Sequence, residues 1–144
     1  MKEKYIRHFL DFYPTESFAT EYLLNYLKLQ NKLIVECCAG KNDMTDVLKK
    51  ENTVITNDIN SELKTNYHLD ASKINFWSKL EYDNRKPDWV ITNPPFNNAH
   101  LILPNAFDSC KEGCAFLLRL SYLEPTQKKN SRGQWLEKYN DHLR

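Results

Sequence analysis

The stretch "KLIVECCAGKNDMTDVLKKENTVITND", residues 32–58, decides the fold. Two short apolar runs, at residues 32–38 and 53–58, are typical of buried strands. Between them, residues 44–50 ("MTDVLKK") predict a short helix. A strand, a helix and a second strand in this order predict a parallel pair, because parallel strands need a crossover connection.

The alternation of strands and helices continues on both sides of this unit. Apolar side chains along one face predict a helix over residues 15–30, and further helical segments are expected around residues 74–80, at 98–110 and at 132–139. Further strands are expected at 66–71, 88–92 and 114–123. Because the strands are apolar throughout, we expect a mostly parallel sheet with helices on both faces, an α/β fold of the Rossmann-like kind.

Length and charge narrow the class of protein. The 144 residues predict a single domain, residues 1–144. A net charge of +1 excludes binding to nucleic acid through bulk charge alone. No apolar run approaches the length of a membrane span, and the start "MKEKYIRHFL" lacks the apolar core of a signal peptide. We therefore expect a cytoplasmic location and no membrane partner.

The cysteines do not predict a metal site. Cys37 and Cys38 are adjacent, and Cys110 and Cys114 are four residues apart, which is poor spacing for zinc. No pair of histidines accompanies them. We expect buried thiols and no bound metal.

Four polar residues fall at the expected ends of strands. They are Glu36, Asp58, Asp70 and Asn93. In open parallel sheets, ligands bind outside the carboxyl ends of the strands. The sequence therefore predicts a ligand site at this edge of the sheet.

The loop "ECCAGKND", residues 36–43, is a candidate cofactor loop. Gly40 allows the backbone to approach a ligand, and the helix that follows presents free amide groups. Asp58 lies 22 residues after Glu36, near the spacing at which an acid meets ribose hydroxyls in Rossmann-type folds. The fingerprint G-x-G-x-x-G is absent, which disfavours NAD. A smaller, positively charged nucleoside fits better.

The stretch "DWVITNPPFNNAH", residues 88–100, suggests the chemistry. An exocyclic amine on a purine is a poor nucleophile because its lone pair is delocalised into the ring. The side-chain carbonyl of Asn93 and the backbone carbonyl of Pro94 can accept hydrogen bonds from its two N–H groups and free the lone pair. Pro94 and Pro95 fix the two acceptors, and Phe96 offers a ring face on which a base can stack.

Four segments in this order, "FYPTESFATEYLL", "VECCAG", "TNDIN" and "NPPF", resemble S-adenosylmethionine-dependent amino-methyltransferases. The resemblance is closest to the adenine-specific DNA methyltransferases of bacteria and phages, and it covers about residues 9–125. It implies a Rossmann-like methyltransferase fold, S-adenosylmethionine as cofactor, and DNA as partner, with the target adenine turned out of the helix. Asn93, Pro94, Pro95 and Phe96 would form the catalytic motif.

The resemblance also implies where the cofactor binds. We expect its methionine end at Tyr13 and Thr15, its methionine and sulfonium region at Glu36 and Gly40 with Ala39 in the same loop, its ribose hydroxyls at Asp58 and its adenine amine at Asp70.

The sequence departs from the family in three places. Asn42 stands where a second glycine is expected, and Glu16 stands where a proline is common. Two further strands and a target-recognition segment are expected after the fifth strand, so the sheet is predicted to lack its last strands. Its fifth strand would then be an exposed edge, which predicts a homodimer through this edge or a longer chain.

Other readings stay open. The same chemistry suits an RNA adenine or the amide of a protein glutamine, and a catalytically degenerate fold would bind cofactor or a partner without transfer. "NPPF" alone is also typical of a strand-ending turn, Asp70 of a helix cap, and Tyr13 and Thr15 of a helix start. The buried strand before Asn93, together with the acids at the other strand ends, favours the site.

Overall fold

Four short strands form one parallel sheet in the computed structural model, which describes residues 17–118. The strands are β1 (Leu33–Glu36), β2 (Thr53–Thr56), β3 (Trp89–Thr92) and β4 (Gly113–Phe116). Their order in the sheet is β2-β1-β3-β4, and each neighbouring pair is parallel. The predicted α/β class with a parallel sheet is confirmed for this part of the chain.

The register brings the carboxyl ends of the strands to one edge. Glu36 pairs with Thr56, and Thr92 pairs with Phe116. From β1 the chain first adds β2 on one side and then β3 on the other, so the direction of winding reverses between β1 and β3. This point is the topological switch at which open α/β sheets bind their ligands.

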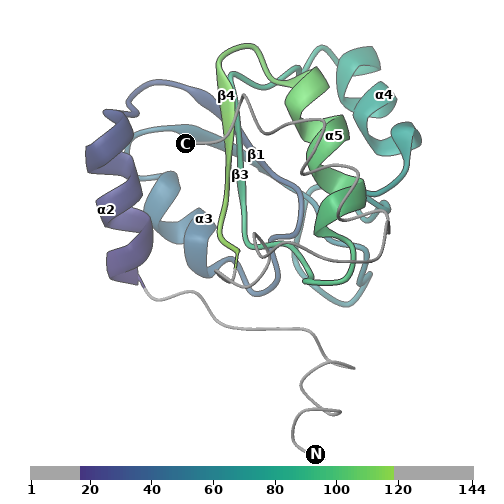
Figure 1. The fold of residues 1–144 in the computed structure, drawn as a ribbon, viewed down its shortest axis with the longest axis horizontal. Coiled ribbons are helices and arrows are strands. Elements are labelled where there is room, and N and C mark those ends of the chain that lie inside the picture. The colour runs from purple at the N-terminus through teal and green to yellow at the C-terminus, as the bar shows by residue number, and fades with distance from the viewer. Residues whose placement is uncertain (1–16, 119–144) are drawn as a thin grey trace, which may run out of the picture.

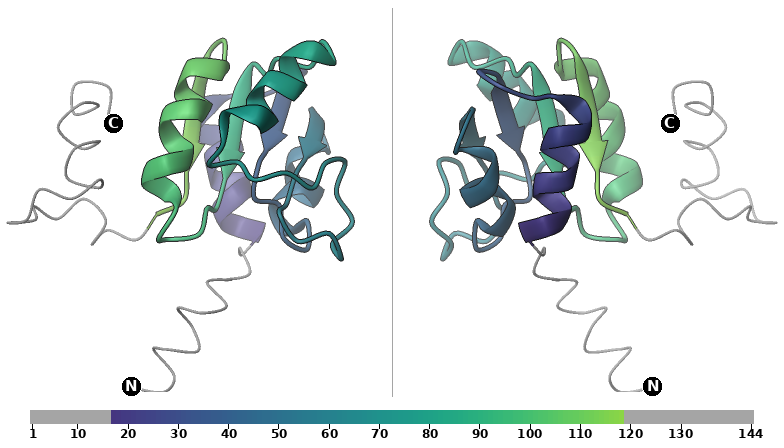
Figure 2. Two further views of the ribbon diagram at one scale, coloured as in Figure 1. Left: turned by 90° about the vertical axis from the view of Figure 1, so that its right-hand side faces the viewer. Right: turned by 90° about the vertical axis from the view of Figure 1, so that its left-hand side faces the viewer.

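Helices cover both faces of the sheet, as Figures 1 and 2 show. The helices are α2 (Ser17–Leu27), α3 (Asp43–Leu48), α4 (Ile74–Tyr82) and α5 (Ala99–Ser109). α2 and α3 lie on one face, and α4 and α5 lie on the other. Two layers of helices around a parallel sheet bury the strands on both sides.

The alternation of side chains along the strands places the two larger core clusters on opposite faces of the sheet. Ile34 and Ile91 point toward α2 and α3, where they pack with Leu48. Val35 and Val90 point to the opposite face, where they pack against α4 and α5. Because both faces are apolar, the short strands read as continuous apolar runs in the sequence.

One predicted strand is wrong. Residues 66–71 contribute a single parallel bridge, between Asn57 and Tyr67. The side chain of Asn66 accepts a hydrogen bond of 2.9 Å from the Thr56 backbone amide, and the Thr65 hydroxyl donates one of 2.7 Å to the Tyr67 carbonyl. These polar side chains thus bond to backbone groups that would pair with a neighbouring strand in a regular sheet.

The remaining elements agree with the sequence within a few residues. α2 ends at Leu27, because Lys28 adopts a left-handed conformation with φ of 54°. The predicted strand at 114–123 corresponds to β4 as far as the described residues reach, and the predicted helix at 132–139 lies outside them. No helix within residues 17–118 has the length and apolar character needed to cross a membrane.

Candidate functional site

The loop that follows β1 is tied to both neighbouring strands. The backbone amide of Cys38 donates a hydrogen bond of 3.1 Å to the Thr92 hydroxyl at the end of β3. The backbone amide of Ala39 donates one of 2.9 Å to the Asn57 carbonyl just beyond β2. The end of β1 is therefore fixed to the strand ends on either side of it.

Gly40 turns the loop and brings Asp58 to it. Its φ of 56° lies in the left-handed region, which glycine adopts without a steric penalty. Its amide donates a hydrogen bond of 2.9 Å to one carboxylate oxygen of Asp58, and the Asn60 amide donates one of 2.9 Å to the other oxygen. Since a carboxylate has about four acceptor positions, Asp58 keeps capacity for further donors.

Glu36 ends β1 as a buried acid. It is 1% exposed, and its carboxyl group hydrogen-bonds to the hydroxyl of Thr45 in α3. The pKa of Glu36 is raised to about 8, chiefly by burial and to a smaller extent by the negative charges of Asp43 and Asp58, against the lowering effect of the Thr45 hydrogen bond. At neutral pH the Glu36 carboxyl is therefore mostly protonated, and a cation placed beside it would favour its ionised form.

The "NPPF" residues form the turn from β3 into α5. Pro94 is buried, and Asn93 is partly exposed at the strand end. The Pro95 carbonyl accepts hydrogen bonds of 3.1 and 3.0 Å from the amides of Asn98 and Ala99, and so holds the first turn of α5. Pro95 therefore stabilises the turn that directly follows Asn93 and Pro94. The side-chain carbonyl of Asn93 and the backbone carbonyl of Pro94 are the two acceptors expected for an amine.

Phe96 is partly exposed and packs beside α5. Its ring contacts the cluster made by Ala99 and Leu103, which Phe116 of β4 also contacts. This packing holds the ring in place at the strand-end edge. A ring fixed in this way loses little conformational entropy when a flat ligand stacks on its exposed face.

Asn57 is a site residue that the sequence analysis did not single out. It is fully buried, and its side-chain amide donates hydrogen bonds of 2.9 Å to the Cys37 carbonyl and 2.8 Å to the Leu69 carbonyl. Its side-chain oxygen accepts one of 2.9 Å from the Leu69 amide. Asn57 therefore holds the segment before Asp70 against the loop after β1.

Asp70 lies in a turn before α4 and not at the end of a strand. Its carboxylate accepts hydrogen bonds of 2.9 Å from the Ser72 amide and 2.6 Å from the Ser72 hydroxyl. These bonds, the hydroxyl's first, lower the pKa of Asp70. These local bonds close a turn ahead of α4. Asp70 does not cap that helix, because the N-cap of α4 is Lys73 and has no side-chain cap hydrogen bond.

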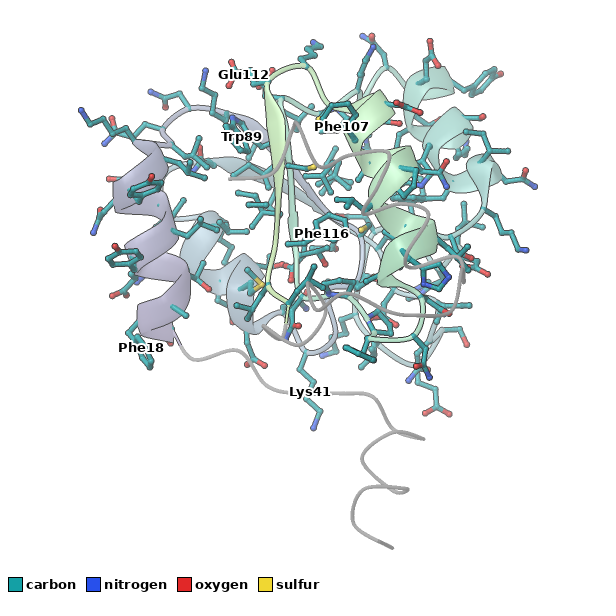
Figure 3. All side chains as sticks on the ribbon, viewed as in Figure 1. Phe18, Lys41, Trp89, Phe107, Glu112 and Phe116 are labelled. Atoms are coloured by element: carbon teal, nitrogen blue, oxygen red, sulfur yellow. The ribbon has the colours of Figure 1, made fainter. Side chains whose placement is uncertain are left out.

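The structure brings most of the predicted residues to one edge of the sheet. Those at the edge are Glu36, Ala39, Gly40, Asp58, Asn93, Pro94, Pro95 and Phe96, with Asp70 beside them in the turn that Asn57 anchors. Tyr13 and Thr15 lie outside the described residues. Lys41, in the same loop as Gly40, extends from this edge into solvent (Figure 3).

Two further residues were missed for a common reason. Thr45 and Thr92 are buried polar side chains whose partners, Glu36 and the Cys38 amide, are distant in sequence. For Thr92, the sequence did offer one signal: a polar residue ends the apolar run "VIT" at residues 90–92.

The four cysteines are free thiols, of which Cys37 is buried and the others are partly buried.

Comparison with known proteins gives a likeness in fold. No protein-family model and no curated protein matches this chain. A solved structure named "Putative hemolysin from Streptococcus thermophilus" matches 81% of the chain with a TM-score of 0.60 and 13% sequence identity. The match spans 47% of the length of that protein. At this identity, the comparison shows a shared backbone fold.

Proposed function

We propose that this protein is an S-adenosylmethionine-dependent methyltransferase that acts on the exocyclic amine of adenine in DNA. One observation carries the proposal. Asn93-Pro94-Pro95-Phe96 leaves β3 at the topological switch point, and the Cys38–Thr92 hydrogen bond fixes it beside the loop after β1. A motif suited to amine activation and a loop suited to a nucleoside cofactor thus share one edge.

The residues on the β1 and β2 side fit a cationic nucleoside cofactor. Glu36 is a buried acid whose carboxyl becomes a favourable counter-charge when a cation is near. Asp58 keeps acceptor positions for two hydroxyl groups, and Gly40 leaves room where the loop approaches it. When bound, S-adenosylmethionine supplies an electrophilic methyl group on a sulfonium.

The residues on the β3 side act on the nucleophile. The side-chain carbonyl of Asn93 and the backbone carbonyl of Pro94 accept hydrogen bonds from the two N–H groups of the amine. This draws the nitrogen toward a tetrahedral shape and makes its lone pair available for an in-line displacement. Phe96 stacks on the base. A base turned out of a duplex loses its stacked neighbours, and the ring of Phe96 replaces one of them.

The experiment is transfer of labelled methyl from S-adenosylmethionine to unmethylated DNA. RNA and a protein mixture serve as parallel substrates, because an RNA adenine and a glutamine amide present the same planar amine. The expected result is label in adenine of DNA, formed about a hundred- to a thousandfold more slowly by Asn93→Ala. Label in RNA or protein instead would reassign the substrate, and no label in any of them would remove the catalytic proposal.

A second candidate is a binding protein with a degenerate methyltransferase fold. Two observations favour it. Both oxygens of Asp58 already accept backbone amides, and Asn42 adopts a left-handed φ of 69° while its side chain donates to the Lys64 carbonyl at 3.0 Å. These bonds fix the loop through groups of the chain itself. Binding of S-adenosylmethionine without transfer to any substrate would support this candidate.

A further inference from the structure

Two thiols lie together where α5 ends and β4 begins. Cys110 directly follows the last residue of α5, and Cys114 lies in β4. Cys114 is paired with Val90 across the sheet, so its side chain points to the same face as that of Val90. Both cysteines pack against the core cluster on this face, which α4 and α5 cover. The fold therefore places the two side chains on one side of the sheet.

The two sulfur atoms contact each other. The thiols of Cys110 and Cys114 are joined by a hydrogen bond. The Cys110 thiol also donates a hydrogen bond of 3.4 Å to the carbonyl of Phe107, one turn earlier in α5. Because the proton of Cys110 is directed at that carbonyl, Cys114 is the donor and the Cys110 sulfur the acceptor in the bond between the thiols.

The backbone around the pair is held by hydrogen bonds. The Cys110 amide donates one of 3.0 Å to the Ala106 carbonyl, and the Glu112 amide donates one of 2.9 Å to the Asp88 carbonyl. The ladder between β3 and β4 holds Cys114 itself. A disulfide needs its sulfur atoms about 2.0 Å apart. Since the two thiols already touch, forming this bond requires movement mainly of the two side chains.

The two thiols differ in reactivity. The hydrogen bond from Cys114 holds the pKa of Cys110 below its usual range, although burial opposes this effect. The same hydrogen bond, and then burial, raise the pKa of Cys114. The thiolate is the nucleophilic form of cysteine, and both residues are partly exposed, so a small oxidant can reach them. Cys110 is therefore the thiol that reacts first, and Cys114 is placed to react with the product.

The other two cysteines provide a contrast. Cys37 is 1% exposed, in the core beneath the loop after β1. The pKa of Cys38 is raised well above its usual range, first by its hydrogen bond to Cys37 and then by burial of its thiol. Buried thiols of this kind are inert. The features of a reactive thiol with a neighbouring partner thus coincide at Cys110 and Cys114.

We propose that Cys110 and Cys114 form a peroxide-sensitive dithiol, which closes to a reversible disulfide between the end of α5 and β4. The Cys110 thiolate attacks one oxygen of hydrogen peroxide and the O–O bond breaks. The released hydroxide takes up the proton that Cys110 had lost and becomes water, and Cys110 is left as a sulfenic acid. The Cys114 sulfur then attacks the Cys110 sulfur. The S–S bond forms, the S–O bond breaks, and the leaving hydroxide takes the Cys114 proton to give a second water.

The reaction is a two-electron exchange. Two thiols are oxidised to one disulfide, and one peroxide is reduced to two waters. The new bond joins the end of the helix that follows the "NPPF" turn to the neighbouring strand. This inference does not rest on the proposed function.

The test is mass spectrometry of the full chain after treatment with hydrogen peroxide. Remaining thiols are blocked by alkylation, and the chain is digested with trypsin. Cleavage after Lys111 places Cys110 and Cys114 in different peptides, so a disulfide between them joins the two peptides. The expected result is this joined product, with loss of the mass of two hydrogen atoms from the intact chain. Dithiothreitol should reverse both changes.

Serine variants separate the two roles. Cys114→Ser should stop at the sulfenic acid of Cys110, which a dimedone probe labels, whereas Cys110→Ser should leave Cys114 reduced at the same dose of peroxide. Cys38→Ser is the matched control and should form the disulfide as the parent chain does.

Three results on the unmutated chain would overturn the proposal, so it does not depend on a variant folding. The first is Cys110 and Cys114 both alkylated after peroxide. The second is oxidation of Cys37 or Cys38 at a lower dose. The third is a disulfide between two chains, seen as a cross-linked dimer on a non-reducing gel.

Discussion

The hydroxyl of Thr92 accepts a 3.1 Å hydrogen bond from the backbone amide of Cys38, and so joins the end of β3 to the loop after β1. Thr92 is fully buried and directly precedes Asn93. The position of the "NPPF" turn relative to the proposed cofactor loop therefore depends on this contact. It is the link between the two halves of the candidate site.

Replacing the Thr92 hydroxyl should loosen that link. Thr92→Val keeps the shape of the side chain but leaves the Cys38 amide unsatisfied, which costs about 1–3 kcal/mol of unfolding free energy. Thr92→Ser retains the hydroxyl and should cost less. Urea denaturation of the two variants checks this, and equal stabilities would show that the hydrogen bond contributes little.

Glu36 should make stability depend on pH. Its pKa is about 8 in the folded protein against an ordinary value of 4.5, so the folded state binds the proton more tightly. The resulting stabilisation is fully present below pH 4.5 and is lost as the pH rises through about 8. Between these values the slope approaches about −1.4 kcal/mol per pH unit.

Glu36→Gln is the matched variant for this prediction, because glutamine is neutral at every pH and can still accept from Thr45. Urea denaturation from pH 5 to 8 should give a falling stability for the parent chain and a flatter curve for Glu36→Gln. Parallel curves for the two proteins would mean that Glu36 is ionised in the fold at neutral pH.

Asp58 should contribute to both the loop and the cofactor. Asp58→Ala removes the acceptors of the Gly40 and Asn60 amides, so it should destabilise the chain by about 1–3 kcal/mol as well as weaken binding of S-adenosylmethionine. Asp58→Asn retains one carbonyl acceptor and should lie between the parent and Asp58→Ala. Calorimetry of cofactor binding beside urea denaturation separates the two effects.

The contact between Gly113 and Trp89 lies at the end of the sheet opposite Lys41, where Figure 3 shows Trp89 and Glu112 together. A methyl group on Gly113 would lie 2.9 Å from two ring atoms of Trp89. Gly113→Ala should therefore cost about 1–3 kcal/mol through overpacking. Trp89→Leu should cost stability by itself but should remove most of the additional cost of Gly113→Ala. A full additional cost in the Trp89→Leu background would locate the strain elsewhere.

The sequence predicted the parallel sheet because its strands are buried on both faces and read as short apolar runs. It also predicted Glu36 and Asn93 at strand ends, since each directly ends or follows such a run. The strand predicted at residues 66–71 was wrong. These residues were expected to form a strand ending at Asp70, but the side chains of Thr65 and Asn66 bond to the backbone and prevent regular pairing.

The hydrogen bonds that hold the site together could not be predicted from the sequence. Asn57 bonds to Cys37 and Leu69, which are 20 and 12 residues away along the chain. Such pairings depend on the tertiary packing of the strands, and no local pattern encodes them. The raised pKa of Glu36 also follows from burial, which the sequence indicated only through the apolar run before it.

The central claim is that the "NPPF" turn activates an amine, and single-turnover methyl transfer to an adenine-containing duplex tests it most directly. Asn93→Ala should transfer methyl about a hundred- to a thousandfold more slowly than the parent chain, as for loss of a hydrogen bond that stabilises a transition state. Titration with S-adenosylmethionine should give near-parent affinity, because the cofactor is held at the other strand ends. Phe96→Ala is the companion variant, and it should weaken capture of the duplex by about 1–3 kcal/mol. Transfer by Asn93→Ala at the rate of the parent chain would contradict the account and reduce "NPPF" to a turn into α5.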